Sequence, residues 1–331
     1  MTFRIIFLLL MYPFLICAAF AEISHPELPE SGDPSDTLQV LLSVPEEEID
    51  LGWSKLSIDT LIDEDANVSS NLAAIEAIAS ILLTQIGAGA SSAERVAALR
   101  TYIYKSGEWN GFEPYSYDFT DPSGMLASHK SLHRYLATRR GNCINMPMLF
   151  LAIGERMGVT MNITTAPGHV FIQFENPDTG IVEHLETTSG AQPQRIVWQR
   201  EILPMTDTAI EAGMYMKRLT KRQQVTVMGE ALLQMSHERG DHRERIELAE
   251  LILSHFPECD VALLHIVDAS RSLIMEKIVP LYRHPGEMPP DILAKFEAWA
   301  FSHDHAVSAL DRLGWQPATP NPNVQLPGQG K

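Results

Sequence analysis

The chain has 331 residues, and its 42 acidic residues against 25 lysines and arginines give a formal net charge of −17. Phosphate backbones and anionic lipid surfaces repel such a protein, so nucleic acid and anionic membranes are poor partners for it. A chain of this length exceeds the usual single core, so two or three structural units are expected.

The first 21 residues, MTFRIIFLLLMYPFLICAAFA, combine one arginine, an apolar run and a small-residue end. This pattern is typical of a secretory signal peptide cleaved after Ala21, so we expect a secreted, periplasmic protein. Cys17 lies inside this segment, and the bulky Ile16 before it argues against lipid attachment. No later stretch has an uninterrupted apolar run of about 18 residues, so no membrane span is expected in the mature chain.

Composition and periodicity predict the unit boundaries. Residues 22–36 are rich in proline and acidic residues and predict a mobile linker, and residues 314–331 predict a disordered tail. Between them the hydrophobic pattern changes near residue 205. We therefore expect one unit over 37–205 and a second, separable unit over 206–313.

The first unit starts with helical periodicity. Apolar residues recur at helical spacing through residues 70–105 and again in residues 131–139, and an aromatic- and Asp-rich loop over 112–124 lies between them. These stretches predict core helices that precede the cysteine.

Cys143 stands in RRGNCINMPMLFLAIGERMGV, where a polar turn leads into an amphipathic helix. Counting back along the apolar stripe places its thiol at the helix N-terminus, on the inward face. Free N–H groups and the helix dipole favour thiolate over thiol at that position, whereas a buried mid-helix cysteine is only an apolar filler. Pro147 lies one step beyond the first turn counted from Cys143, so an irregular turn is expected.

After this helix the period changes to that of strands. Residues 160–166, 169–174 and 181–187 alternate, with turn residues between them. We therefore expect an α+β unit in which the helix bearing Cys143 packs on an antiparallel sheet.

Three residues in chain order have the chemistry of a thiol-dependent site: Cys143, His169 at the head of a strand, and Glu186 on the next strand. A thiol nucleophile needs a base to accept its proton and an acid to orient that base. Each residue alone is a weak signal, but the combination is specific. Glu183 is the alternative acid.

The number of residues in the hairpin loop, even or odd, decides which of the two acids, Glu186 or Glu183, lies near His169. Pro177 to Gly180 fit a four-residue loop, and an even loop places Glu186 opposite Phe171, one diagonal step from His169. An odd loop would place Glu183 there instead. We therefore predict a Glu186 carboxylate oxygen within hydrogen-bond reach of the His169 ring.

Four motifs together resemble bacterial members of the transglutaminase-like superfamily, which have the papain-like thiol fold: YSYDFTDPSG, YLATRRGNCINMPMLFLAIGERMG, APGHVFIQF and HLETTSG. The resemblance extends from Thr37 to about Arg200. It implies that Cys143 is the nucleophile, His169 the general base and then acid, and Glu186 the orienting carboxylate, where many relatives carry aspartate. No cofactor is expected.

The oxyanion of a tetrahedral intermediate needs hydrogen-bond donors already in place. The candidates are the Cys143 backbone N–H and a side-chain amide from Asn142 or Asn145. Asn142 is also a candidate N-cap of the helix, which is the favoured role.

Residues 206–313 are predicted to be wholly helical. Two helices flank Gly240 and end at Pro257, and further helices are expected over 260–279 and 291–313. Paired helices of this kind suggest degenerate tetratricopeptide-like hairpins, although the aromatic signature residues of that repeat are missing. Such helices also often follow transglutaminase-like domains.

No metal site and no structural disulfide are predicted. His237 and His242, like His303 and His305, lack a ligand spacing and are interpreted as solvated helix ends. A bridge from Cys143 to the second mature cysteine, Cys259, is not needed to stabilise a chain of this size.

The resulting hypothesis is an exported thiol enzyme that transfers acyl groups from amides, with hydrolysis by a peptidase or amidase preferred on the resemblance alone. The first alternative is transglutaminase-type crosslinking, in which a lysine amine replaces water. The second is a catalytically idle domain that acts as a scaffold through its helices. A protein or peptide substrate is expected, and the C-terminal helices are candidates for recruiting it.

Overall fold

The computed structural model describes residues 25–121, 124–195, 200, 202–203 and 205–317. The predicted signal segment 1–21 lies outside the described residues, as do residues 318–331 of the predicted tail.

Four helices form the N-terminal part: α1 (Pro34–Ser43), α2 (Leu51–Ile62), α3 (Val68–Ile86) and α4 (Ser92–Tyr104). α1 begins inside the segment expected to be a linker, because Pro34 fits the first helical position and Asp33 caps the helix. α2 is buried along its length from Leu51 to Asp59. It therefore lacks the one-sided apolar stripe that would identify it in the sequence.

Among the described helices, α3 alone has the length and composition of a helix that crosses a membrane. In this fold it packs against α2, α4 and α6. Its side chains Ile75, Ile78, Ala79 and Leu82 are buried.

The segment around Cys143 consists of η3 (Ala127–Lys130), α5 (Leu132–Thr138), β2 (Arg140–Gly141) and α6 (Asn145–Arg156), and β2 pairs in parallel with β1 (Ser116–Tyr117). α6 begins at Asn145, so Cys143 lies in the preceding turn rather than on the helix as expected. The Met146 N–H donates to the Asn142 carbonyl, but Pro147 has no N–H to donate to the Cys143 carbonyl. The first turn is therefore separated from the regular helix, which is the irregularity that Pro147 predicts.

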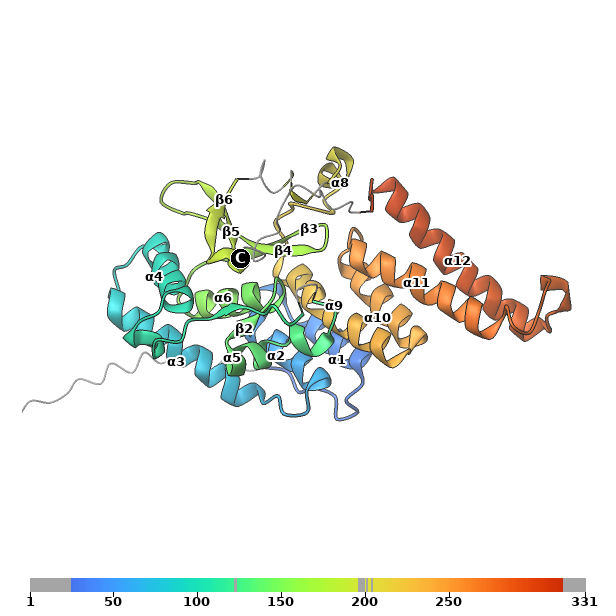
Figure 1. Cartoon of the computed structure of the whole chain (residues 1–331), viewed down its shortest axis with the longest axis horizontal. Helices are drawn as coiled ribbons and strands as arrows, with labels where there is room; N and C mark the ends of the chain where they lie inside the picture. The colour runs from blue at the N-terminus through green and yellow to red at the C-terminus, as the bar shows by residue number, and fades with distance from the viewer. Residues whose placement is uncertain (1–24, 122–123, 196–199, 201, 204, 318–331) are drawn as a thin grey trace, which may run out of the picture.

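Four antiparallel strands in sequential order form the main sheet: β3 (Met161–Ala166), β4 (His169–Glu175), β5 (Val182–Glu186) and β6 (Gln192–Gln194). α6 packs against β3 and β4. The predicted α+β unit, with a helix packed on an antiparallel sheet, is confirmed (Figure 1).

The outer edge of β3 is covered by residues 214–219 rather than left open. The Met216 N–H donates to the Thr165 carbonyl (2.9 Å), and the Leu219 N–H donates to the Ile163 carbonyl (3.3 Å). An uncovered strand edge favours pairing with other chains, so this segment protects the sheet. Residues 214–219, within the region predicted to be wholly helical, are therefore an irregular segment that lies along the sheet.

The C-terminal helices are α8 (Asp207–Glu211), α9 (Lys221–Arg239), α10 (His242–His255), α11 (Asp260–Lys277) and α12 (Pro290–Arg312). Gly240 ends α9 in the left-handed conformation (φ 69°), as the sequence predicts. The helical character of this region is confirmed, whereas the tetratricopeptide assignment stays a prediction. In Figure 1 the pair α11 and α12 extends away from the sheet.

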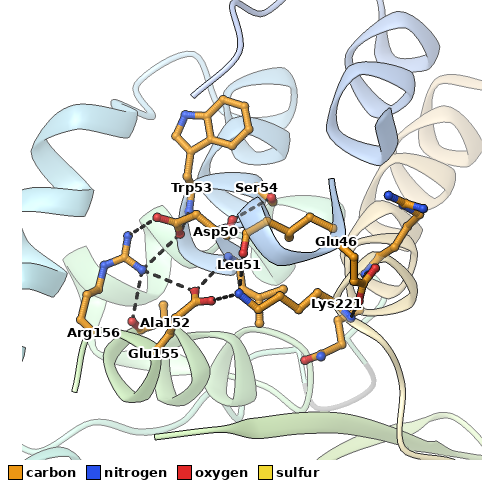
Figure 2. Close-up of polar contacts among 12 residues, drawn as sticks. Glu46, Asp50, Leu51, Trp53, Ser54, Ala152, Glu155, Arg156 and Lys221 are labelled. Atoms are coloured by element: carbon orange, nitrogen blue, oxygen red, sulfur yellow. Dashed lines mark hydrogen bonds and ion pairs between the residues drawn. The ribbon is translucent and has the colours of Figure 1, made fainter. Parts of the chain in front are cut away.

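A polar network joins the start of α9 to the N-terminal helices and α6 (Figure 2). The Glu46 carboxylate accepts from the backbone N–H groups of Lys221 and Arg222, the first residues of α9. The Lys221 ammonium group donates to the Ile49 carbonyl and pairs with Glu155. The first turn of α9 is therefore held by residues from two earlier segments.

A second ion pair in Figure 2 connects α6 to α2. Arg156 donates to both carboxylate oxygens of Asp50, at 3.1 and 2.7 Å, and Asp50 also accepts from the Trp53 N–H. One continuous hydrophobic core runs from α1 to α12. The predicted boundary near residue 205 therefore crosses a shared core.

Candidate active site

The turn that carries Cys143 is closed by two asparagines. The Asn142 N–H donates to Asn145 Oδ1 (2.8 Å), while Asn142 Oδ1 accepts from the Ile144 N–H (2.9 Å). The Asn142 carbonyl also accepts the first backbone bond of the helix, from Met146 (3.1 Å). Asn142 thus caps this turn, which is the favoured of its two predicted roles.

The side-chain amides of both asparagines are directed toward η3. The Asn142 Nδ2 group donates to the His129 carbonyl (3.0 Å), and the Asn145 Nδ2 group donates to the carbonyls of His129 (2.9 Å) and Ser131 (3.0 Å). Both hydrogens of Asn145 are therefore used, which argues against it as an oxyanion donor. The Cys143 backbone N–H has no acceptor among the described residues.

Gly141, directly before the turn, allows this close packing. A Cβ atom at this position would lie 2.3 Å from Asn145 Oδ1 and 2.7 Å from the Tyr135 ring. Neither neighbour has room to move, because both side chains are fully buried. Glycine is therefore required here by space rather than by backbone angles.

His169 begins β4 and lies between a thiol and a carboxylate. The two-residue turn Pro167-Gly168 precedes it, with Gly168 at a φ of 63°. The ring Nε2 lies 2.7 Å from Glu186 Oε2, and the imidazole also hydrogen-bonds with the Cys143 side chain. The structure therefore brings Cys143, His169 and Glu186 together in one chain of contacts.

Glu186 ends β5 and is held at both carboxylate oxygens. Its Oε1 atom accepts from the Thr188 backbone N–H (3.0 Å) and hydroxyl (2.7 Å), which leaves Oε2 for His169. The side chain is buried, with 2% of its area exposed. Such a carboxylate has little freedom to rotate away from the ring.

The register of the hairpin explains why this acid lies here. Glu175 pairs with Val182 and Ile172 with Leu185, and Glu186 follows directly after this last pair, on the side of Phe171. Residues 177–180 form the loop, as predicted, and Gly180 takes a positive φ of 68°. Glu183 is three residues from Glu186 and faces the opposite side of the sheet.

The electrostatic environment favours the charged forms of both His169 and Glu186. Burial lowers the pKa of the His169 imidazole, but the Glu186 carboxylate and the hydrogen bond with Cys143 together raise it to about 10. Burial raises the pKa of Glu186, but the His169 charge and the bonds from Thr188 bring it below its ordinary value. At neutral pH the site therefore holds an imidazolium between the Glu186 carboxylate and the Cys143 side chain, an arrangement that can donate a proton.

Tyr117 is a site neighbour that sequence reasoning missed. It pairs with Gly141 in the short parallel ladder beside the Cys143 turn. Burial and the nearby Cys143 raise the pKa of its phenol to about 12, so the hydroxyl stays protonated. The motif YSYDF contains this tyrosine, but nothing in its local pattern indicates that β1 lies next to β2.

An apolar rim borders the turn. We use this term for Phe119, Met125 and Leu126, whose side chains are 58%, 57% and 46% exposed. The Phe119 ring packs edge-on against Tyr117 (5.3 Å between centroids). The Asp121 carboxylate accepts from the N–H groups of Met125 and Leu126, so these exposed side chains stand on a fixed backbone.

The second mature cysteine has a different environment. Cys259 is 2% exposed, its thiol donates to Glu230 Oε1 (3.5 Å), and burial raises its pKa. Both described cysteines are free thiols.

His237 and His242, which lie outside the site, have protein partners. His242 Nε2 lies 3.2 Å from Glu276 Oε1, and His237 contacts Arg245. Among the described residues, no group of three or more His, Cys, Asp or Glu side chains is arranged to hold a metal ion.

Comparison with known protein families identifies a domain in this chain. Residues 69–190 match the family described as Transglutaminase-like superfamily (Transglut_core2). This span includes Cys143, His169 and Glu186, and it excludes α1, α2 and the C-terminal helices. No curated protein matches the chain.

Proposed function

We propose that this chain, whose residues 69–190 form a transglutaminase-like superfamily domain, is a thiol enzyme that transfers acyl groups from amide bonds. The observation that carries the proposal is the contact chain from Cys143 through His169 to Glu186, with the imidazole held in its charged form. The assignment of Cys143 as nucleophile and His169 as acid and base is part of this proposal.

The first half of the reaction forms a thioester. The Cys143 thiolate attacks the carbonyl carbon of the amide, and the negative charge moves to the carbonyl oxygen, where the Cys143 N–H is the available donor. The His169 imidazolium then gives its proton to the leaving nitrogen, and the C–N bond breaks. Glu186 keeps the ring oriented throughout.

The second half releases the acyl group. His169, now neutral, accepts a proton from water as the oxygen attacks the thioester, and the Cys143 thiolate leaves. A lysine amine in place of water would give a crosslink. Water is our preferred acceptor, and a protein or peptide with an apolar residue beside the amide is the preferred substrate because the apolar rim borders the turn.

One experiment separates the outcomes. The full chain is incubated with a periplasmic protein extract in H₂¹⁸O together with a biotinylated alkyl amine. Hydrolysis places ¹⁸O in new carboxyl groups, transamidation places biotin on substrate proteins, and Cys143→Ala gives neither product. If the wild type and Cys143→Ala give the same products, the domain is a scaffold and the enzyme proposal is wrong.

We also propose that residues 1–21 direct export and are removed. The support is the charge and apolar pattern of this segment alone. N-terminal sequencing of the protein expressed in a Gram-negative bacterium is expected to start at Glu22, in the periplasmic fraction. A cytosolic protein that starts at Met1 would contradict this.

A further inference from the structure

The C-terminal helices reach the Cys143 turn through η3. Glu238, in the last turn of α9, accepts a hydrogen bond from the Ala127 backbone N–H at Oε1 (2.7 Å). The Gln234 side chain donates to the same oxygen (3.4 Å), which fixes the carboxylate. Ala127 is only 1% exposed, whereas Glu238 is itself an exposed residue, so its carboxylate covers this N–H from the solvent side.

The other side of η3 contacts the turn itself. The His129 carbonyl accepts from Nδ2 of both Asn142 and Asn145, at 3.0 and 2.9 Å. These two asparagines lie on either side of Cys143 and close its turn. An unbroken series of hydrogen bonds and one short 3₁₀ helix therefore connects α9 to the thiol.

η3 packs against α9, and the charge of its Lys130 also reaches α11. Burial and Asp260 raise the pKa of Glu230, in α9, to about 8, and the nearby Lys130 charge opposes this rise. Burial, Arg245 and Lys130 together lower the pKa of His265, in α11, to about 3. Lys130, the last residue of η3, therefore lies within electrostatic range of both helices.

We propose that Glu238 is a positioning residue for the Cys143 turn, so that the C-terminal helices act in the reaction itself by holding η3. Glu238 touches no reacting atom. Its loss would leave the Ala127 N–H without an acceptor, and η3 would shift to find another one. The His129 carbonyl and both asparagine amides would follow, and the thiol would move relative to His169.

The expected consequence is kinetic. A displacement of a reacting group by about 1 Å can cost on the order of 100-fold in rate. The kinetic part of this inference rests on the proposed function, whereas the effect on thiol reactivity does not require a substrate.

The test compares four variants of the full chain by the rate at which iodoacetamide alkylates Cys143, with Cys259 as the internal reference. Glu238→Ala is expected to react roughly 10- to 100-fold more slowly than wild type. Glu238→Gln should react at close to the wild-type rate, because its amide oxygen still accepts from Ala127. Glu238→Asp keeps the charge but retracts the acceptor, so it should also react slowly.

Glu247→Ala is the matched control, because Glu247 is an exposed glutamate on α10. It should leave the rate unchanged. Rescue by Glu238→Gln adds a readout that loss of the charge alone would not give, because Glu238→Gln and Glu238→Ala both remove the charge and only Glu238→Gln keeps an acceptor for Ala127.

Two results would overturn the inference: a wild-type rate in both Glu238→Ala and Glu238→Asp, or a Glu238→Gln variant as slow as Glu238→Ala. If Glu238→Ala does not fold, the Cys143 alkylation rates of Glu238→Asp and Glu238→Gln test the inference instead, and equal rates would overturn it. A wild-type Cys143 that reacts no faster than glutathione would instead refute the proposed function.

Discussion

α9 and α12 are both long helices of the C-terminal region, yet they belong to different environments. α9 buries every side chain from Gln224 to Ser236, whereas α12 buries only Ala306 and Leu310 and leaves Phe301 71% exposed. Glu46, Lys221 and Glu238 connect both ends of α9 to the segments around the site. Helices of one C-terminal region can therefore divide between the shared core and its periphery.

Deletion gives the largest expected difference between these two helices. A chain without residues 206–331 should lose cooperative thermal unfolding, because it exposes the face of α2 that α9 covers and the edge of β3. A chain without residues 290–331 should stay folded and keep a reactive Cys143. Circular dichroism melting and alkylation measure both. A folded 37–205 fragment that labels at Cys143 would show that the two units are separable after all.

The two acids of β5 provide the next test. Glu186→Gln should reduce acyl transfer on the order of 100-fold or more, because the ring loses the carboxylate that orients and charges it. Glu183→Gln should stay within about twofold of wild type, since this residue faces away from the ring. Steady-state kinetics measures both, and equal losses would contradict the assignment.

Truncation of one apolar side chain on each helix tests the difference in burial between α9 and α12 with a smaller perturbation than deletion. Leu232→Ala, in α9, should lower the free energy of unfolding by about 2–5 kcal/mol, since the side chain is fully buried. Phe301→Ala, in α12, should change it by less than about 0.5 kcal/mol. Urea denaturation measures both values. Similar losses would mean that a partner or a second copy covers Phe301.

The smallest expected effect is a pH dependence confined to the core. A raised histidine pKa adds stability that is fully present below its ordinary value of 6.5 and is lost as the pH rises to about 10. The lowered Glu186 pKa adds stability above its ordinary value of 4.5, which is lost in more acidic solution. The stability difference between wild type and Glu186→Gln should therefore be largest between pH 4.5 and 6.5.

That difference should shrink as the pH approaches 10. Histidine NMR of wild type should show the His169 ring protonated well above pH 7. A ring that titrates near 6.5 would contradict the charged pair.

Local rules were enough to predict part of the site. The Pro-Asp-Thr-Gly loop sets the hairpin register, and the register alone selects Glu186 over Glu183. The switch from helical to alternating periodicity after Val159 predicts the order of helix and sheet. These features depend on residues close together in the sequence.

The missed features depend on long-range contacts. The position of Asn145 depends on carbonyls of His129 and Ser131, and the role of Glu238 depends on Ala127, far earlier in the chain. α2 carries the buried ion pair Lys55 and Asp59. In the sequence alone, these charged residues suggest a helix exposed to solvent, whereas α2 is buried. The hydrophobic periodicity of the sequence does not indicate hydrogen-bond and ion-pair partners of this kind.

The bond between Glu46 and the Lys221 N–H spans 175 residues of sequence. A ribosome adds about 5–20 residues each second, so Glu46 is made roughly 10–35 s before the helix end that it caps. Once His169 has been made, the nascent chain has its thiol and its imidazole but still lacks residues 214–219, which cover β3, and α9. The surroundings of the Cys143 turn are therefore complete only late in synthesis, and the edge of β3 stays uncovered until residues 214–219 have been made.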